Sequence, residues 1–258
     1  MQTTTVRAGP LTVSLVPSAD NYIYLLEWAG GGAVVDPGSA APVLRQIEQR
    51  GVRVNLILAT HRHGDHVAGI PEVKRKTGAR VVGPKGAGVP EVDREVSGGD
   101  RVDVGPVEAE VIETPGHTST DITYYLAGAG IAFCGDTLFA GGCGRLFECG
   151  PDVMWSSLRK LRDLPGETQI FCGHEYTQDN LAFAATVDAG NPLLQDRIAR
   201  VKDLLKRGEP TIPSTIEVER ATNPFLRSDV DALRNAVGLA DADPASVFAE
   251  LRARKDRF

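Results

Sequence analysis

The five histidines of this chain lie in short segments that follow apolar, strand-like runs. Leu56-Ile57-Leu58 leads into a six-residue segment, His61–His66, that contains three of them. Three later apolar runs lead in the same way to His117, Asp136 and His174. Strand ends at one edge of a sheet are where α/β proteins build their sites. We therefore expect seven side chains to converge: His61, His63, Asp65, His66, His117, Asp136 and His174.

Imidazole and carboxylate are donors that suit Zn²⁺, Fe or Mn²⁺, and a carboxylate can bridge two ions. The set divides into His61, His63 and His117 for one ion and Asp65, His66 and His174 for a second, with Asp136 shared between the two. Each ion then has room for a water molecule. The pattern predicts a pair of divalent ions, most simply Zn²⁺, with Asp65 and Asp136 acting beside a metal-bridging water.

A simpler interpretation exists for each part of this set. A lone histidine in a loop is more often solvated or packed in a core than bound to a metal, and this alternative applies to His117 and His174 taken singly. The cluster His61–His66 could be a surface cation-binding tract. It has no role in an apolar core, where unpaired polar groups are costly.

The periodicity of the chain predicts an α/β domain over residues 1–174 and a helical domain over residues 175–258. Helices are expected at Pro42–Arg50, around Met154–Leu161, over Leu194–Leu205, after Ser228 as a cap, and from Asp243-Pro244 onward. Strands are expected at Val13–Val16, Tyr22–Leu26, Ala33–Val35, Leu56–Leu58, Arg80–Val82, Glu108–Ile112, Ile122–Leu126, Ile131–Cys134 and Gln169–Cys172.

Composition narrows the class of protein. The 28 Lys and Arg against 34 Asp and Glu give a net charge of −6, which opposes broad attraction to nucleic acid or anionic lipid. No apolar run approaches the ~18 residues that would span a membrane, and the first ten residues lack a secretory pattern. The 4 cysteines are too sparse for a disulfide framework, so we expect reduced thiols in a cytoplasmic protein. We expect a monomer.

The segment Thr60–His66 resembles the signature of the metallo-β-lactamase superfamily. Within it, the chain is similar to the hydroxyacylglutathione hydrolase (glyoxalase II) family through Gly135–Glu148, Cys172–Thr177, Asn223–Arg227 and Arg252–Phe258. The resemblance implies an α+β fold, an αβ/βα four-layer sandwich with a small C-terminal helical domain. It implies hydrolysis of S-2-hydroxyacylglutathione thioesters, such as S-D-lactoylglutathione, to glutathione and a 2-hydroxy acid such as D-lactate.

The resemblance also implies substrate contacts from Arg145, Phe147, Tyr176, Arg252 and Lys255. Guanidinium groups suit the carboxylates of glutathione. These residues other than Phe147 also have a simpler interpretation. Arg252 and Lys255 would be a solvated basic helix end, which the helix dipole favours. Tyr176 would be a packing residue, and Arg145 would form a salt bridge within a loop. Two positions depart from the family pattern. Phe147 stands where many members have tyrosine, and Asp121 stands where the family often has histidine.

Three other functions remain open on the sequence alone. An iron-dependent persulfide dioxygenase, or another hydrolase of this fold, would use the same ligand pattern. A non-catalytic member of the superfamily would normally lack ligands, and none of the seven is missing here. A nuclease would need a positively charged track for phosphates, which the acidic balance of the chain does not supply.

Overall fold

The computed structural model describes residues 3–258, which form two compact units. Unit 1 runs to Glu113 and also contains Thr120–Gly135. Unit 2 contains Thr114–Ser119 and Asp136–Phe258. The chain thus passes from unit 1 to unit 2 after Glu113, returns to unit 1 for Thr120–Gly135, and continues in unit 2 from Asp136.

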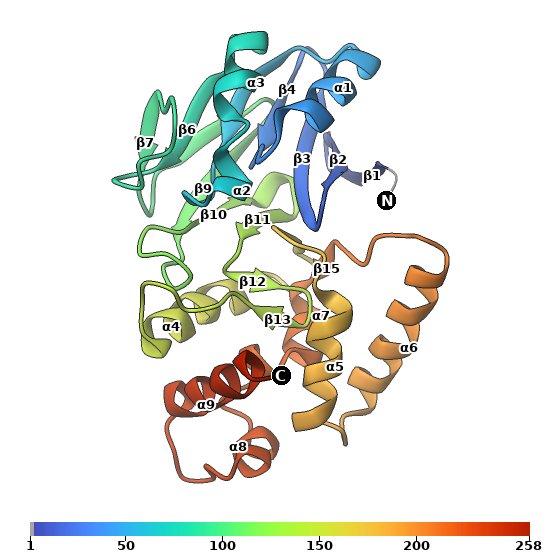
Figure 1. Cartoon of the computed structure of the whole chain (residues 1–258), viewed down its shortest axis with the longest axis vertical. Helices are drawn as coiled ribbons and strands as arrows, with labels where there is room; N and C mark the ends of the chain where they lie inside the picture. The colour runs from blue at the N-terminus through green and yellow to red at the C-terminus, as the bar shows by residue number, and fades with distance from the viewer. Residues whose placement is uncertain (1–2) are drawn as a thin grey trace. The chain divides into compact units, whose positions relative to one another are not determined.

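The first sheet of unit 1 has seven strands in sequence order (Figure 1). The first four strands pair antiparallel and β4 to β7 pair parallel. Its strands are β1 (Thr4–Ala8), β2 (Leu11–Ser18), β3 (Asn21–Trp28), β4 (Gly31–Val35), β5 (Val54–Leu58), β6 (Arg80–Pro84) and β7 (Arg94–Val96). The continuous apolar runs in β3, β4 and β5 are typical of strands that are covered on both faces.

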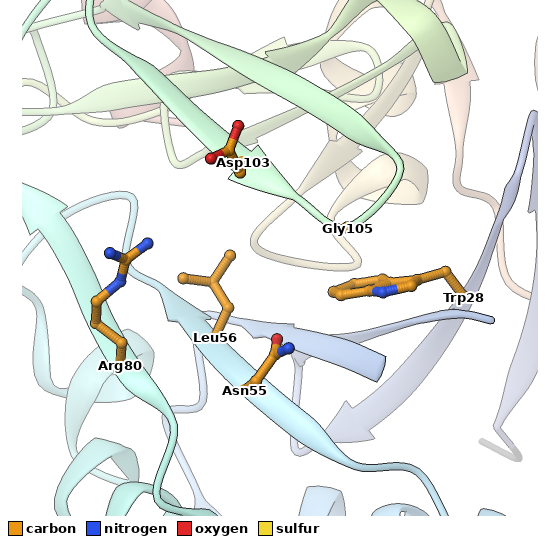
Figure 2. Close-up of a pocket in the computed structure, with 6 residues that line it drawn as sticks. All are labelled: Trp28, Asn55, Leu56, Arg80, Asp103 and Gly105. Carbon is orange, nitrogen blue, oxygen red and sulfur yellow. The ribbon is translucent and has the colours of Figure 1, made fainter. Parts of the chain in front are cut away.

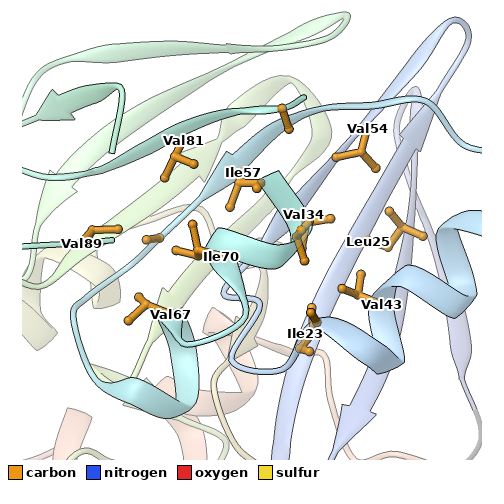
Figure 3. Packing of buried hydrophobic residues seen from close by; sticks show 14 of the residues in the cluster. Ile23, Leu25, Val34, Val43, Val54, Ile57, Val67, Ile70, Val81 and Val89 are labelled. Carbon is orange, nitrogen blue, oxygen red and sulfur yellow. The ribbon is translucent and has the colours of Figure 1, made fainter. Parts of the chain in front are cut away.

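Three helices cover one face of this sheet: α1 (Ala40–Arg50), α2 (Gly64–Val67) and α3 (Ile70–Thr77). Val43 of α1 and Ile70 of α3 are fully buried, and Figure 3 shows them pointing at Val34 and Ile57 on the strands. Helix α1 ends where the sequence predicted, because Gly51 adopts the left-handed conformation with φ 64°. This core fixes the strand end from which the His61–His66 segment begins.

A second group of strands in unit 1 runs antiparallel in the order β8–β9–β10–β11. These are β8 (Arg101–Val104), β9 (Val107–Glu113), β10 (Ile122–Leu126) and β11 (Ile131–Gly135), with a 3₁₀ turn, η1 (Ala127–Ala129), before β11. The buried Tyr124 hydroxyl donates to the carbonyl of Ala59 at 3.0 Å. This bond ties β10 to the segment that follows β5 in the first sheet.

Unit 1 has a cavity of about 300 Å³ that is lined by Trp28, Asn55, Leu56, Arg80, Asp103 and Gly105 (Figure 2). The indole of Trp28 can lie against the turn between β8 and β9 because Gly105 lacks a side chain. A Cβ there would be 2.3 Å from the Trp28 ring. None of the predicted metal ligands lines this cavity.

Unit 2 is mainly helical. Its strands are β12 (Leu138–Phe139) and β13 (Gly142–Cys143), which form a hairpin, and β14 (Gln169–Cys172), which pairs with β15 (Ser214–Thr215). Its helices are α4 (Pro151–Arg162), α5 (Thr177–Val187), α6 (Pro192–Lys206), α7 (Ile216–Thr222), α8 (Asp231–Val237) and α9 (Pro244–Asp256), with a 3₁₀ turn, η2 (Pro224–Leu226). A cluster of aromatic rings, Phe183, Phe225 and Phe248, joins α5, η2 and α9.

All nine predicted strand runs lie inside strands, and the predicted helices are present. Asp243 caps α9 as expected, since its carboxylate accepts from the backbone N–H of Ala245 and Ser246. The prediction that Ser228 caps a helix is wrong. Helix α8 begins at Asp231 with Val230 as its N-cap, and Ser228 lies two residues further upstream and is fully buried.

Candidate metal centre

Four predicted ligands lie together in unit 1, on the segment that follows β5. His61 and His66 are each 1% exposed, and their ring centroids are 4.1 Å apart. His63, the N-cap of α2, brings its ring centroid to 4.9 Å from that of His61. Asp65 Oδ2 lies 3.7 Å from His66 Nε2. Three imidazoles and a carboxylate therefore gather within one short segment.

Asp36, directly after β4, holds this cluster in place, and sequence analysis did not identify it. Its carboxylate accepts from the Thr60 backbone N–H at 2.8 Å and from the Thr60 hydroxyl at 2.6 Å. The same carboxylate lies 3.0 Å from His66 Nδ1. The Thr60 hydroxyl in turn lies 3.1 Å from His61 Nδ1. Metal-binding histidines are usually held in this way through their second ring nitrogen, which leaves Nε2 to face the ion.

Two further residues place Asp65. The Asn21 amide donates to the backbone carbonyl of Asp65 at 3.2 Å and to its Oδ2 at 3.1 Å. Gly38 passes so close that a Cβ there would be 1.7 Å from the Asp65 carbonyl oxygen. Any side chain at position 38 would therefore displace the α2 segment. The signal for Asn21 and Gly38 is not visible in a single sequence, because each acts across a long separation along the chain.

The other three predicted ligands lie together in unit 2. His117, Asp136 and His174 are 5%, 7% and 5% exposed. Asp136 Oδ2 lies 3.4 Å from His117 Nε2 and 3.3 Å from His174 Nε2. In a tetrahedral zinc site with metal–ligand distances of about 2.0 Å, two ligand atoms lie roughly 3.3 Å apart. Each of the two distances from Asp136 Oδ2 to a histidine Nε2 therefore fits a pair of ligand atoms on one ion. The donor types and their spacing fit divalent cations.

Backbone groups and rings orient the two histidines of unit 2. His117 Nδ1 lies 2.9 Å from the carbonyl oxygen of Arg145, which turns Nε2 toward Asp136. The turn that follows Asp136 is tight, since a Cβ at Gly144 would be 2.0 Å from the Asp136 carbonyl oxygen. The ring of His174 stacks on that of Tyr176, with centroids 4.6 Å apart and planes 7° apart. Tyr176 thus fixes the plane of His174.

All five predicted substrate contacts belong to unit 2. Phe147 is 62% exposed and its ring meets that of His117 at 5.1 Å. The Arg145 side chain is also exposed, with Nε 3.8 Å from Asp256 Oδ1. Both side chains are therefore open to a ligand on the surface of unit 2.

Arg252 and Lys255 of α9 are more buried. The Arg252 guanidinium donates to the Cys143 carbonyl at 3.0 Å and to Asp256 at 2.9 Å, so it also has a structural role. Lys255 Nζ donates to the Asp179 carbonyl at 3.0 Å and lies 5.1 Å from the Phe258 ring. Burial, followed by the charge of Arg252, lowers the pKa of Lys255. An anionic group bound there would oppose that shift.

Two of the buried cysteines can be excluded as alternative nucleophiles. Cys134, Cys143 and Cys172 are buried, and Cys149 is partly buried. Burial raises the pKa of Cys143 to about 11 and that of Cys172 to about 12. A thiol acts as a nucleophile only as the thiolate, so neither side chain is reactive near neutral pH.

Comparison with known proteins defines the class. Residues 19–174 match the model of the metallo-beta-lactamase superfamily. Two solved structures have the same fold: ETHE1 from Myxococcus xanthus (TM-score 0.64, 23% identity, 99% of this chain and 98% of that one) and TTHA1623 in a di-iron-bound form (TM-score 0.60, 24% identity, 82% and 98%). The chain has the metallo-β-lactamase fold, as the sequence predicted.

Residues 175–258 match the hydroxyacylglutathione hydrolase C-terminus. The hydroxyacylglutathione hydrolase of Cereibacter sphaeroides is 48% identical over 254 residues, covering 96% of this chain and 100% of that one. That of Rhodospirillum rubrum is 49% identical over 244 residues, covering 93% and 95%. The chain belongs to the hydroxyacylglutathione hydrolase family. Over residues 3–258, no helix is long and apolar enough to cross a bilayer.

Proposed function

We propose that this protein hydrolyses the thioester of S-2-hydroxyacylglutathiones, with S-D-lactoylglutathione giving glutathione and D-lactate. Family membership supports this reaction, and one observation carries it. The buried Asp136 carboxylate lies 3.4 Å from His117 Nε2 and 3.3 Å from His174 Nε2. A carboxylate between two imidazoles in a buried site is suited to sharing between two cations.

The proposed ligands of one ion are His61, His63 and His117, and those of the other are Asp65, His66 and His174, with Asp136 common to both. When bound, divalent ions act as Lewis acids and lower the pKa of a coordinated water toward about 7. Zn²⁺ is the proposed metal, since imidazole and carboxylate are its usual ligands in hydrolases, and Fe or Mn²⁺ would accept the same set.

The residues of the chain supply orientation and charge. Asp36 and Thr60 hold the outer nitrogens of His66 and His61, so that these rings keep one orientation throughout turnover. No general acid is needed, because a thiol with pKa near ~8.5 leaves as the thiolate. This agrees with the assignment of all 5 histidines to metal binding, which leaves none to donate a proton.

Glutathione carries two carboxylates, and unit 2 offers cations that could receive them. Arg145, with its exposed guanidinium, and Lys255 are the proposed charged contacts. Tyr176, Phe147 and Arg252 complete the proposed set. In this scheme residues 1–174 supply all seven metal ligands, and residues 175–258 supply three of the five substrate contacts. We also propose that the protein is a cytoplasmic monomer, because the four cysteines would remain reduced in that compartment.

The test is hydrolysis of S-D-lactoylglutathione, followed by thiol release, with metal content measured on the same sample. We expect release that requires about two ions per chain. Absence of thiol release from fully metallated protein would overturn the proposal. Oxygen consumption with glutathione persulfide, in place of thiol release, would assign the persulfide dioxygenase reaction instead.

A further inference from the structure

The turn between β12 and β13 separates Asp136 from Arg145, and its backbone is held by side chains from the C-terminal helices. The Asn223 amide donates to the carbonyls of Phe139 at 3.3 Å and Gly142 at 3.0 Å. Glu219 accepts from the backbone N–H of Gly141 at 2.9 Å. The Asn180 amide donates to the Ala140 carbonyl at 3.2 Å. Four consecutive residues of the turn thus bond to side chains outside it.

These side chains are themselves fixed. Asn223 and Glu219 are each 0% exposed, and the Asn223 amide also donates to Glu219 at 2.9 Å. Glu219 pairs with the buried Arg197 of α6 and accepts the hydroxyl of Ser214. A buried charge with its hydrogen bonds satisfied is rigid, because any movement would leave a polar group unpaired.

The turn has almost no room to move. Gly141 has φ 73°, a conformation that favours glycine. A Cβ at Gly142 would be 2.5 Å from the Asn180 side chain. Just beyond the hairpin, the carbonyl of Arg145 orients His117, and Gly144 packs against the carbonyl of Asp136. A shift of the turn would therefore move Asp136 and the partner of His117 together.

We propose that Asn223, with Glu219 and Asn180, forms a clamp that positions Asp136 and Arg145 for metal and substrate binding. These are positioning residues that act through the β12–β13 turn. The inference rests on the proposed function for its effect on turnover. Its effect on metal affinity does not depend on which substrate is hydrolysed.

The principal test is Asn223→Asp. The aspartate keeps an oxygen that can accept from the backbone N–H of Phe225, as Asn223 Oδ1 does at 3.0 Å. It loses the amide donor to the turn and places a second carboxylate beside Glu219, so that both bonds of the clamp to the turn are weakened. We expect affinity for Zn²⁺, measured by chelator competition, to fall at least tenfold, with kcat/KM for S-D-lactoylglutathione falling by at least as much. If Asn223 only caps η2, both quantities will stay within twofold of wild type, and the clamp is refuted.

The matched control is Asn191→Ala. Asn191 is a capping asparagine in the same unit, whose amide donates to the Ala221 carbonyl at 2.8 Å, and it makes no bond to the turn. We expect it to lower thermal stability while Zn²⁺ affinity and KM stay within twofold. Equal loss of Zn²⁺ affinity in the control would also overturn the clamp, because the effect would then be general destabilisation.

Two smaller changes decide the question if Asn223→Asp does not fold. Asn180→Ala removes one bond of the clamp, and Gly142→Ala pushes the turn away from Asn180. Each should weaken Zn²⁺ binding several-fold, and wild-type affinity in both would refute the clamp. Wild-type protein that binds Zn²⁺ without hydrolysing the thioester would refute the proposed function alone.

Discussion

The histidines of the two units are oriented by different kinds of partner. In unit 1 the carboxylate of Asp36 contacts His66 directly and His61 through Thr60. In unit 2 a backbone carbonyl, that of Arg145, orients His117, and a stacked ring orients His174. The unit 1 arrangement depends on the side chains of Asp36 and Thr60, and because Asp36 contacts both Thr60 and His66, one substitution can disturb it. The orientation of His117 depends on where the backbone places the Arg145 carbonyl. It should therefore change when the residues that hold this part of the backbone are substituted.

The largest effect should come from Asp136→Ala, which removes the carboxylate that lies beside both histidines of unit 2. We expect turnover to fall by at least about 10³-fold and bound metal to decrease, because the proposed shared ligand is lost. The measurement is thiol release together with metal analysis. Comparable kcat in fully metallated variant and wild type would refute the role of Asp136.

Asp36→Asn tests the side-chain arrangement of unit 1. An amide keeps the shape of the carboxylate but is a weaker partner for the His66 ring. Replacing such partners typically costs about 10- to 100-fold in metal affinity. We expect a loss in this range by chelator competition. Arg145→Ala is the matched variant from unit 2, since its backbone carbonyl remains, and it should leave metal affinity within twofold. Equal losses in the two variants would remove the distinction between the units.

Lys255→Ala should raise KM much more than it lowers kcat, because the ammonium is proposed to bind the substrate and lies on α9, which carries none of the proposed metal ligands. A charged hydrogen bond is worth about 1.5–3 kcal/mol, so we expect KM to rise by about tenfold or more. Steady-state kinetics with S-D-lactoylglutathione measure this. A fall in kcat at constant KM would contradict a binding role.

The smallest effect should come from Phe147→Tyr, which adds the hydroxyl that many family members have. The exposed ring beside His117 leaves room for it. One additional neutral hydrogen bond of about 1 kcal/mol would lower KM by roughly fivefold at most. The variant should leave kcat and metal content unchanged. An unchanged KM would show that position 147 does not contact glutathione.

The same contrast explains what could be predicted from the sequence. The proposed unit 1 ligands lie within six residues, so their pattern is local and can be recognised in the sequence alone. Asp36 was missed because its importance arises from pairing of β4 with β5, where Val35 lies opposite Leu58 and brings Asp36 beside Thr60. A single sequence does not reveal that register.

The elements of unit 2 show that prediction from sequence also depends on a regular apolar pattern. Helix α6 has a regular apolar stripe and was predicted over Leu194–Leu205. In the structure it begins at Pro192, after Asn191 as its N-cap. Helix α5 was missed because the polar Thr177 and Asn180 are buried while the apolar Ala182 is exposed, so its sequence lacks a periodic apolar pattern. The two-residue strands β12 and β13 are too short to give any alternation. Glu219 and Asn223 form hydrogen bonds to that hairpin although they lie 78 to 84 residues further along the sequence.

Unit 2 includes Asp136–Phe258 without interruption, whereas the two family models meet between residues 174 and 175. A protease that nicked the chain at this junction would not release two separable fragments. The stretch 136–174 would still be bound to the rest of unit 2 through the turn carbonyls and the buried Asn223. Engineering that exchanges C-terminal segments between relatives should therefore place its crossover at Gly135 and carry the β12–β13 hairpin along.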